Sequence, residues 1–239
     1  MFEFIGTFFH VVLYQPMLNI LIMLYLFAKD FGLAVILLTI LIKILIHPIN
    51  RKAIESQKKM MDIQPKIKEL QEKYKDDQQR MAIEVMSLYK LHKFNPFAGI
   101  GMLFIQLPII WALFQVFLVG FDLEKIKASF YPFVSVASSI NPNFFGLADL
   151  SLPSIPLTII TALIQYYQIK TSSPANKKDL GTDEKKKEPE IQDIMQKQMT
   201  FLVPIITFVV LFNLPSAVAL YWMVSSLLSI VEQKMIYKK

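Results

Sequence analysis

Long uncharged stretches alternate with charged segments along the 239 residues of this chain. Four stretches lack charge or nearly so: residues 31–49, 97–121, 152–169 and 199–231. The first three have about the 20 residues that a membrane-spanning helix needs, whereas the fourth is longer than one crossing requires. Because Asn213-Leu214-Pro215 is typical of a turn, we expect two short helices there. The pattern predicts an all-α polytopic membrane protein with five transmembrane helices over residues 31–50, 97–121, 152–170, 199–213 and 215–233.

Residues 1–30 form a separate apolar segment, since no charged residue lies between Phe4 and Ala28. Pro16 and Asn19 divide this segment and leave a 12-residue apolar piece. Such a piece is shorter than a span and is typical of an interfacial helix. We therefore expect an amphipathic N-terminal helix on the outer surface of the membrane, with an inserted helix as the alternative. The start MFEF lacks the basic residues of a signal peptide, so no cleavage is expected.

Residues 51–95 mix charges with apolar residues that recur at helical spacing. These apolar positions are Ile54, Met60, Met61, Ile63, Ile67 and Leu70, then Met81, Ile83, Val85, Met86, Leu88 and Tyr89. Lys75-Asp76-Asp77 provides a turn and an acidic helix start between the two sets. Pro65 is expected to kink or restart the first helix. The pattern predicts an antiparallel helical hairpin that projects into the cytoplasm.

The distribution of basic residues gives the chain an orientation. Of the 25 Lys and Arg, 11 lie in residues 51–93, seven in 170–197 and three in 234–239. These segments are cytoplasmic by the positive-inside rule. The N-terminus is then outside and the C-terminus inside, with an outer loop over 122–151, a cytoplasmic loop over 171–198 and a basic tail over 234–239. The net charge of +6 is thus a topology signal rather than a DNA-binding surface.

The composition agrees with a membrane protein. The chain is 54% hydrophobic with a mean hydropathy of +0.44, well above an ordinary soluble domain. It contains no cysteine, which excludes disulfides, thiol catalysis and Cys-ligated zinc.

Lys43 is a charge within the first predicted span. A lysine near the centre of a membrane helix costs about 2.5–3.5 kcal/mol on insertion scales. Position 43 lies about 12 Å inside the helix when counted back from Arg51. A side chain that only snorkels to the interface is one interpretation. The other is a cationic site in a hydrated groove.

Other functional classes find little support in the residues. A small transporter or channel is the main alternative, but we expect no Asp or Glu within the spans to bind a coupling ion. No pair of interrupted helices suggests an inverted repeat. His10, His47 and His92 form no HExxH or Ser–His pattern, so no catalytic residue, metal site or cofactor is expected.

Three long strings resemble the YidC family of membrane protein insertases. They are GLAVILLTILIKILIHPINRKAIESQ, LYKLHKFNPFAGIGMLFIQLPIIWALF and FLVPIITFVVLFNLPSAVALYWMVSSLLSIVEQ. The resemblance covers the chain from about Pro16 to the C-terminus and fits a short form without a large outer domain. It implies five spans around a hydrophilic groove that is open to the cytoplasm and to lipid but closed toward the outside.

The resemblance also implies roles for individual residues. Lys43 stands where the family has an arginine, which keeps the charge but loses the planar fork of donors. The implied groove comprises Lys43, Thr39, Gln106, Gln115, Asn213, Ser225 and Ser226, although serines in membrane helices also serve as small packing residues. The implied slide for an incoming helix comprises Tyr166, Tyr167, Tyr221 and Trp222. Interfacial anchoring is the competing interpretation for Tyr166 and Tyr167.

The function implied by the family is insertion and folding of nascent membrane proteins in the bacterial inner membrane. The cytoplasmic hairpin and the basic tail would meet the ribosome or targeting machinery, while an association with the Sec translocon stays open. A pure chaperone or assembly scaffold is not separable from an insertase by sequence. No nucleotide is required, since burial of the substrate's apolar helix in lipid supplies the driving force.

Overall fold

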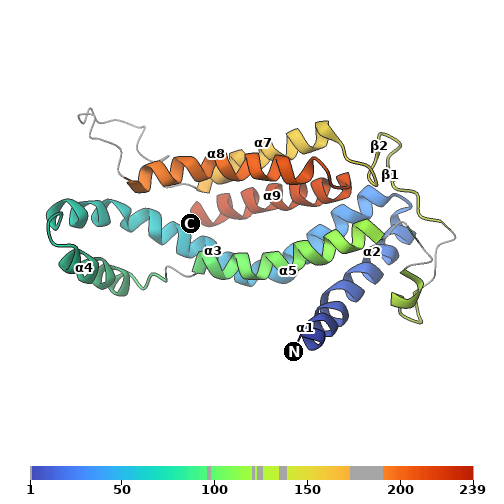
Figure 1. Ribbon diagram of the computed structural model, residues 1–239, viewed down its shortest axis with the longest axis horizontal. Coiled ribbons are helices and arrows are strands. Elements are labelled where there is room, and N and C mark those ends of the chain that lie inside the picture. The colour runs from blue at the N-terminus through green and yellow to red at the C-terminus, as the bar shows by residue number, and fades with distance from the viewer. Residues whose placement is uncertain are drawn as a thin grey trace.

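Helices make up nearly all of the structure, a computed structural model that describes residues 2–95, 98–119, 122, 126–134, 139–172 and 191–238 (Figure 1). The N-terminal arm contains α1 (Phe2–Phe9), a π-helical segment (His10–Tyr14) and α2 (Gln15–Ala28). The remaining helices are α3 (Phe31–Lys73), α4 (Gln78–Leu91), α5 (Ala98–Val119), α7 (Ile155–Ser172), α8 (Ile191–Leu211) and α9 (Ser216–Tyr237). Between α5 and α7 lie a 3-10 turn (Lys127–Ser129) and an antiparallel hairpin of β1 (Asn143–Phe144) and β2 (Ala148–Asp149).

The junction between α2 and α3 is fixed by a short polar cap. Lys29 ends α2 in the left-handed conformation with φ 58°, and Asp30 then caps α3 by accepting a 2.8 Å hydrogen bond from Leu33 N. The second Asp30 oxygen accepts a 2.6 Å bond from Phe145 N, which ties the β hairpin to this corner. Phe144 packs so closely on Gly32 that a Cβ there would lie 2.0 Å from its ring. A glycine is therefore required at position 32.

The apolar core fills the end of the bundle beside this corner, which is the outer end in the predicted topology. α3 packs against α2, α5 and α9, and α9 packs in turn against α7. The largest fully buried side chains in this core are Phe31, Phe117, Leu18, Leu21, Ile22, Leu38, Leu113, Ile126, Leu150 and Leu211.

α3 runs as one helix from this corner into the segment that the sequence predicted as a hairpin. It passes through Pro48 and Pro65 without interruption, so the predicted span 31–50 and the first hairpin helix are a single element. α4 folds back along the far end of α3 (Figure 1), and its N-cap is Asp77, whose side chain accepts a 2.9 Å bond from Arg80 N.

Several helices have the length and composition of membrane spans. Among the described residues, three segments meet both criteria: Gly6–Ala28, Phe31–Lys73 and Ser216–Tyr237. Phe104–Val119 and Thr200–Leu211 are shorter apolar helices. The N-terminal arm is thus long enough to cross a membrane, and its interfacial position stays a prediction.

Candidate functional site

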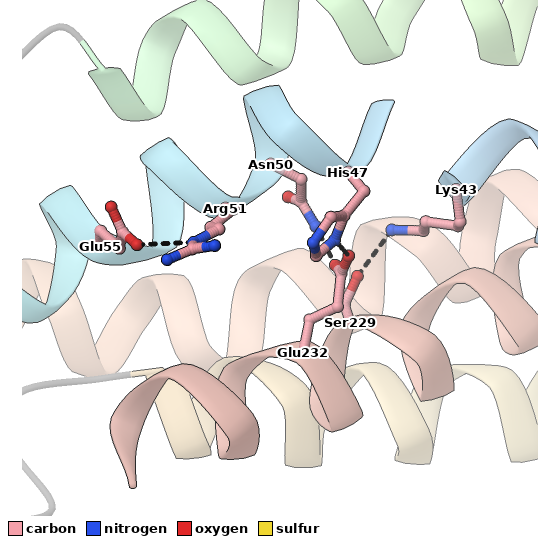
Figure 2. Close-up of polar contacts among 7 residues, drawn as sticks. All are labelled: Lys43, His47, Asn50, Arg51, Glu55, Ser229 and Glu232. Carbon is pink, nitrogen blue, oxygen red and sulfur yellow. Dashed lines mark hydrogen bonds and ion pairs between the residues drawn. The ribbon is translucent and has the colours of Figure 1, made fainter. Parts of the chain in front are cut away.

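A buried lysine and a buried serine join α3 to α9. Lys43 is 8% exposed, and its Nζ donates a 2.7 Å hydrogen bond to Oγ of Ser229 on α9 (Figure 2). The ammonium therefore lies inside the helix bundle, on the side of α3 that faces α9. A hydroxyl is a neutral partner, so this contact orients the ammonium without cancelling its charge.

A second polar cluster, which we name the α3–α9 latch, consists of His47, Asn50 and Glu232. His47 lies one helical turn after Lys43 on α3, and its Nδ1 is 2.6 Å from Oε1 of Glu232 on α9. Asn50 donates from Nδ2 to the other carboxylate oxygen of Glu232. The Glu232 side chain is 14% exposed, whereas that of His47 is 49% exposed. The latch thus lies between buried Lys43 and the Arg51–Glu55 pair farther along α3 (Figure 2).

Glu232 is a site residue that the sequence reasoning missed. It falls within the predicted span 215–233, so the expectation that the spans lack acidic residues is wrong at this position. Its place directly after the uncharged run that ends at Val231 was the available signal. Only the register of α9 against α3 reveals that its carboxylate meets His47 and Asn50.

A pocket of about 490 Å³ opens beside the latch, on the side away from Lys43. Its walls carry both signs of charge and are formed by His47, Arg51, Glu55, Lys58, Lys59, Asp62, Glu232, Met235 and Ile236. Arg51 and Glu55 pair across one helical turn at 2.8 Å (Figure 2). The pocket wall therefore mixes basic and acidic side chains next to the latch.

The comparisons identify the family of this chain. The family described as 60Kd inner membrane protein matches residues 23–239. The chain belongs to this family. Relatives from Pelobacter propionicus and Rickettsia bellii, each named membrane protein insertase YidC, are 32% and 28% identical over 95% of this chain and 39% of their own length. The chain therefore spans about two fifths of these relatives.

A solved structure supports the fold of this family member. It is described as an active YidC insertase crystal structure with the first transmembrane domain resolved. The TM-score is 0.56 with 24% sequence identity, covering 87% of this chain and 42% of the other. The resemblance to the YidC family is thus confirmed, and this likeness adds the helical fold alone.

The groove residues expected in a family member lie in four different places. Thr39, Ser225 and Ser226 are buried on α3 and α9 within about one turn of Lys43 or Ser229. Thr39 donates a 2.7 Å bond to Val35 O. Gln106 on α5 donates a 2.9 Å bond to the hydroxyl of Tyr221.

The other two expected groove residues lie apart from Lys43. Gln115 is half-buried on α5, nine residues beyond Gln106 along the helix. Asn213 is exposed in the turn before α9, roughly 24 Å along the chain axis from Ser229 at 1.5 Å per residue. The structure therefore does not bring Asn213 to the lysine.

The four expected slide residues divide between α7 and α9. Tyr221 is 3% exposed and bonded to Gln106, so it is a packed interhelical residue, and Trp222 is half-buried. Tyr167 is 48% exposed on α7, with Lys234 Nζ 5.8 Å from its ring centroid. Tyr166 contacts Phe201 of α8 at 5.5 Å between ring centroids. On α7, Tyr167 is thus an exposed aromatic side chain, and Tyr166 packs between α7 and α8.

Gln165 is a further buried polar residue without any sequence signal. It is 7% exposed on α7, and its Oε1 is the buried side-chain atom that lacks a hydrogen-bond partner in the described part of the chain. Thr161, one turn earlier, donates to Ala219 O at 3.2 Å and fixes α7 on α9. An unmet buried acceptor is costly, so this interface offers a place for a water or a substrate donor.

Proposed function

We propose that this chain is a membrane protein insertase that passes short polar segments through a hydrated groove between α3 and α9. The observation that carries the proposal is Lys43, buried within the bundle with a neutral hydroxyl as its hydrogen-bond partner. The names of the relatives from Rickettsia bellii and Pelobacter propionicus support the same activity.

A row of buried polar side chains follows the facing surfaces of α3 and α9. It consists of Thr39, Lys43 and Asn50 on α3 and Ser225, Ser226, Ser229 and Gln233 on α9. Polar groups inside a membrane bundle face its interior or water rather than lipid. This row leads from the core at the outer end to the pocket at the cytoplasmic end, which is the course a polar segment would take.

The row lowers the cost of bringing a hydrophilic segment partway into the bilayer. Lys43 would attract acidic or polar groups of that segment, and a single cation holds them weakly enough for release. The substrate's own apolar helix would then move sideways into lipid, gaining about 25 cal/mol for each Å² removed from water. The exposed apolar surfaces of α7 and α8, including Leu163, Tyr167 and Ile205, suit this lateral step.

The topology and partners of the proposed insertase follow from the charge map. Five spans, with the N-terminus outside and the C-terminus in the cytoplasm of a bacterial cell, put the hairpin of α3 and α4 on the side where nascent chains arrive. This hairpin and the basic tail are the proposed contacts with the ribosome or targeting machinery. The proposed substrates are nascent membrane proteins with short, lightly charged translocated segments.

The test is insertion by the purified full chain in liposomes. The substrate is a single-span protein whose short translocated tail carries acidic residues. We expect Lys43→Arg to stay within about twofold of wild type, because the positive charge is kept. We expect Lys43→Glu to lose about tenfold, since it repels the tail and removes the cation that offsets Glu232. Lys43→Ala should fall between them.

Lys52→Glu provides the matched control, because it makes the same charge change at an exposed position of α3. It should insert as wild type does. Equal activity of Lys43→Glu and wild type would contradict the role of the groove charge. Wild-type insertion no higher than in empty liposomes, or an ion flux through the protein, would contradict the insertase itself.

A further inference from the structure

Glu232 places a negative charge between Lys43 and the cytoplasmic pocket. We propose that Glu232 sets the charge preference of the groove by offsetting Lys43, so that wild-type protein accepts neutral segments nearly as well as acidic ones. This inference rests on the proposed insertase function and adds a specificity-determining residue to it.

The helical register brings the two charges into one site. Ser229 and Glu232 are three residues apart on α9, and Lys43 and His47 are four apart on α3, so each pair shares a helix face. Ser229 bonds Lys43 at 2.7 Å while Glu232 bonds His47 at 2.6 Å. Two adjacent hydrogen-bonded contacts therefore link the same two helix faces, and they place the Glu232 carboxylate one helical turn from the partner of the Lys43 ammonium.

The partners of Glu232 hold it in place but do not remove its charge. Asn50 is a neutral donor that is 7% exposed. His47 is neutral unless it is protonated, and it is half-exposed toward the pocket. A carboxylate that is 14% exposed keeps a stronger field than one at the surface.

Further charges near Glu232 line the pocket wall, and they nearly balance. Arg51, Lys58 and Lys59 oppose Glu55 and Asp62 along α3. Arg51 pairs with Glu55 at 2.8 Å. Lys58 Nζ donates to Ile236 O at 3.4 Å, at the end of α9. The exposed pocket charges are screened by water and salt more than the buried pair. Lys43 and Glu232 thus dominate the field along the polar row.

An acidic tail in the wild-type groove therefore meets an ammonium whose attraction Glu232 partly cancels. Neutralising Glu232 leaves the attraction of Lys43 unopposed and removes a direct repulsion at the entrance. A neutral tail gains nothing from either change. The ratio of acidic-tail to neutral-tail insertion consequently reports the action of Glu232 and is insensitive to a general loss of folded protein.

The experiment measures this ratio in proteoliposomes with two substrates that differ only by Glu or Gln in the translocated tail. Glu232→Gln keeps the shape and hydrogen-bonding capacity of the side chain and should raise the ratio by about threefold or more. Glu69→Gln removes a carboxylate from an exposed position of α3 outside this pocket, and it should leave the ratio unchanged. His47→Arg places a permanent cation against Glu232 and should raise the ratio as well, which keeps the test available if Glu232→Gln does not fold.

The coupling to Lys43 has its own test. In a Lys43→Gln background, Glu232→Gln should have less than half of its effect on the ratio, because there is no cation left to release. An unchanged ratio in both Glu232→Gln and His47→Arg overturns the inference while wild-type insertion still stands. An equal effect of Glu232→Gln with and without Lys43 overturns the coupling. Absence of wild-type insertion would instead count against the proposed function.

Discussion

The ammonium of Lys43 on α3 is oriented by the hydroxyl of Ser229 on α9, 186 residues away in the sequence. Buried charges in proteins are normally paired, so a neutral acceptor holds this one at a higher free energy than a carboxylate would. Glu232 lies one turn farther along α9 and bonds His47 and Asn50 instead. The Lys43 ammonium thus lies near the Glu232 carboxylate, while each group hydrogen-bonds to other residues.

Removing the Ser229 hydroxyl tests how much this contact contributes to stability. Ser229→Ala leaves a buried ammonium without its hydroxyl acceptor, which should cost about 1–3 kcal/mol. A thermal unfolding experiment in detergent should show a lower Tm than wild type. Ser226→Ala removes a hydroxyl that is also buried on α9 and should lower Tm less. An equal loss in the two variants would mean that the bond to Lys43 contributes nothing beyond side-chain packing.

The sequence was sufficient to find Lys43. The free energy of inserting a charged residue in an apolar helix can be assessed without knowing which residue it contacts. It was insufficient for Glu232 and Tyr221, whose roles depend on which residue of another helix faces them. Tyr221 was expected on a lipid-facing slide, yet it is buried against Gln106 of α5. Asn213 was expected in the groove from the family resemblance, and it lies in an exposed turn.

At the scale of elements, the corner between α2 and α3 fixes the outer end of the bundle. Asp30 caps α3 and bonds the β hairpin, while Phe144 of β1 packs directly on Gly32. Asn19 of α2 adds a second anchor, since its side chain donates to Ser129 O at 2.8 Å and accepts from Tyr131 N at 2.8 Å. These contacts tie the loop between α5 and α7 to the N-terminal helices.

Gly32→Ala should destabilise this corner. The added methyl group would lie 2.0 Å from the Phe144 ring, and overpacking of this kind costs about 1–3 kcal/mol. The expected result is a lower Tm and faster proteolysis of the loop between α5 and α7. Gly6→Ala is the matched control in α1, because no atom lies within 4 Å of a Cβ there. A Gly32→Ala protein as stable as Gly6→Ala would show that the hairpin shifts freely.

The helical elements were more predictable than the boundaries and contacts between them. Helical spacing and uncharged length indicated α3, α4, α5, α7 and α9, because those patterns reflect local geometry and burial. Pro16 and Asn19 were interpreted as helix breaks, but α2 starts with Pro16 in its first turn and buries Asn19 as an anchor. Proline fits a first helical turn without loss of a hydrogen bond, and the partners of Asn19 lie more than 100 residues away.

At the scale of the whole molecule, we expect water to reach the row of buried polar side chains between α3 and α9, although the proposed insertase holds this row within the membrane. The chain has no cysteine, so single-cysteine variants can report water access. Lys43→Cys should react with a membrane-impermeant maleimide added from the cytoplasmic side, because the reactive thiolate forms only where water reaches it.

Ile44→Cys is the neighbouring control for this labelling. Ile44 is 67% exposed on the outer face of the bundle, where the bilayer would surround it. It should react far more slowly than Lys43→Cys in liposomes and comparably after solubilisation and unfolding. Equal labelling of the two positions in intact liposomes would contradict a groove that is separate from the lipid.

The global arrangement was predictable to the extent that charge and hydropathy determine it. The basic segments give an orientation and the family match gives a helical bundle. The number of spans is less determined, because the N-terminal arm has span-like length while Thr200–Leu211 is short. Helix length and hydropathy alone cannot distinguish an element that crosses the bilayer from one that lies against its surface.

The apolar core at the outer end has an electrical consequence. If water reaches Lys43 from the cytoplasm, the membrane potential falls across the packed layer around Phe31, Phe117 and Leu150 rather than across the full bilayer. The electrostatic free energy of a tail charge that crosses this thin layer changes by about 2.3 kcal/mol for each 100 mV. The change takes place over the length of only a few residues. Cells energise their membranes negative inside, so an acidic tail would be driven outward by the steepest part of that field, while the same layer keeps the resting protein ion-tight.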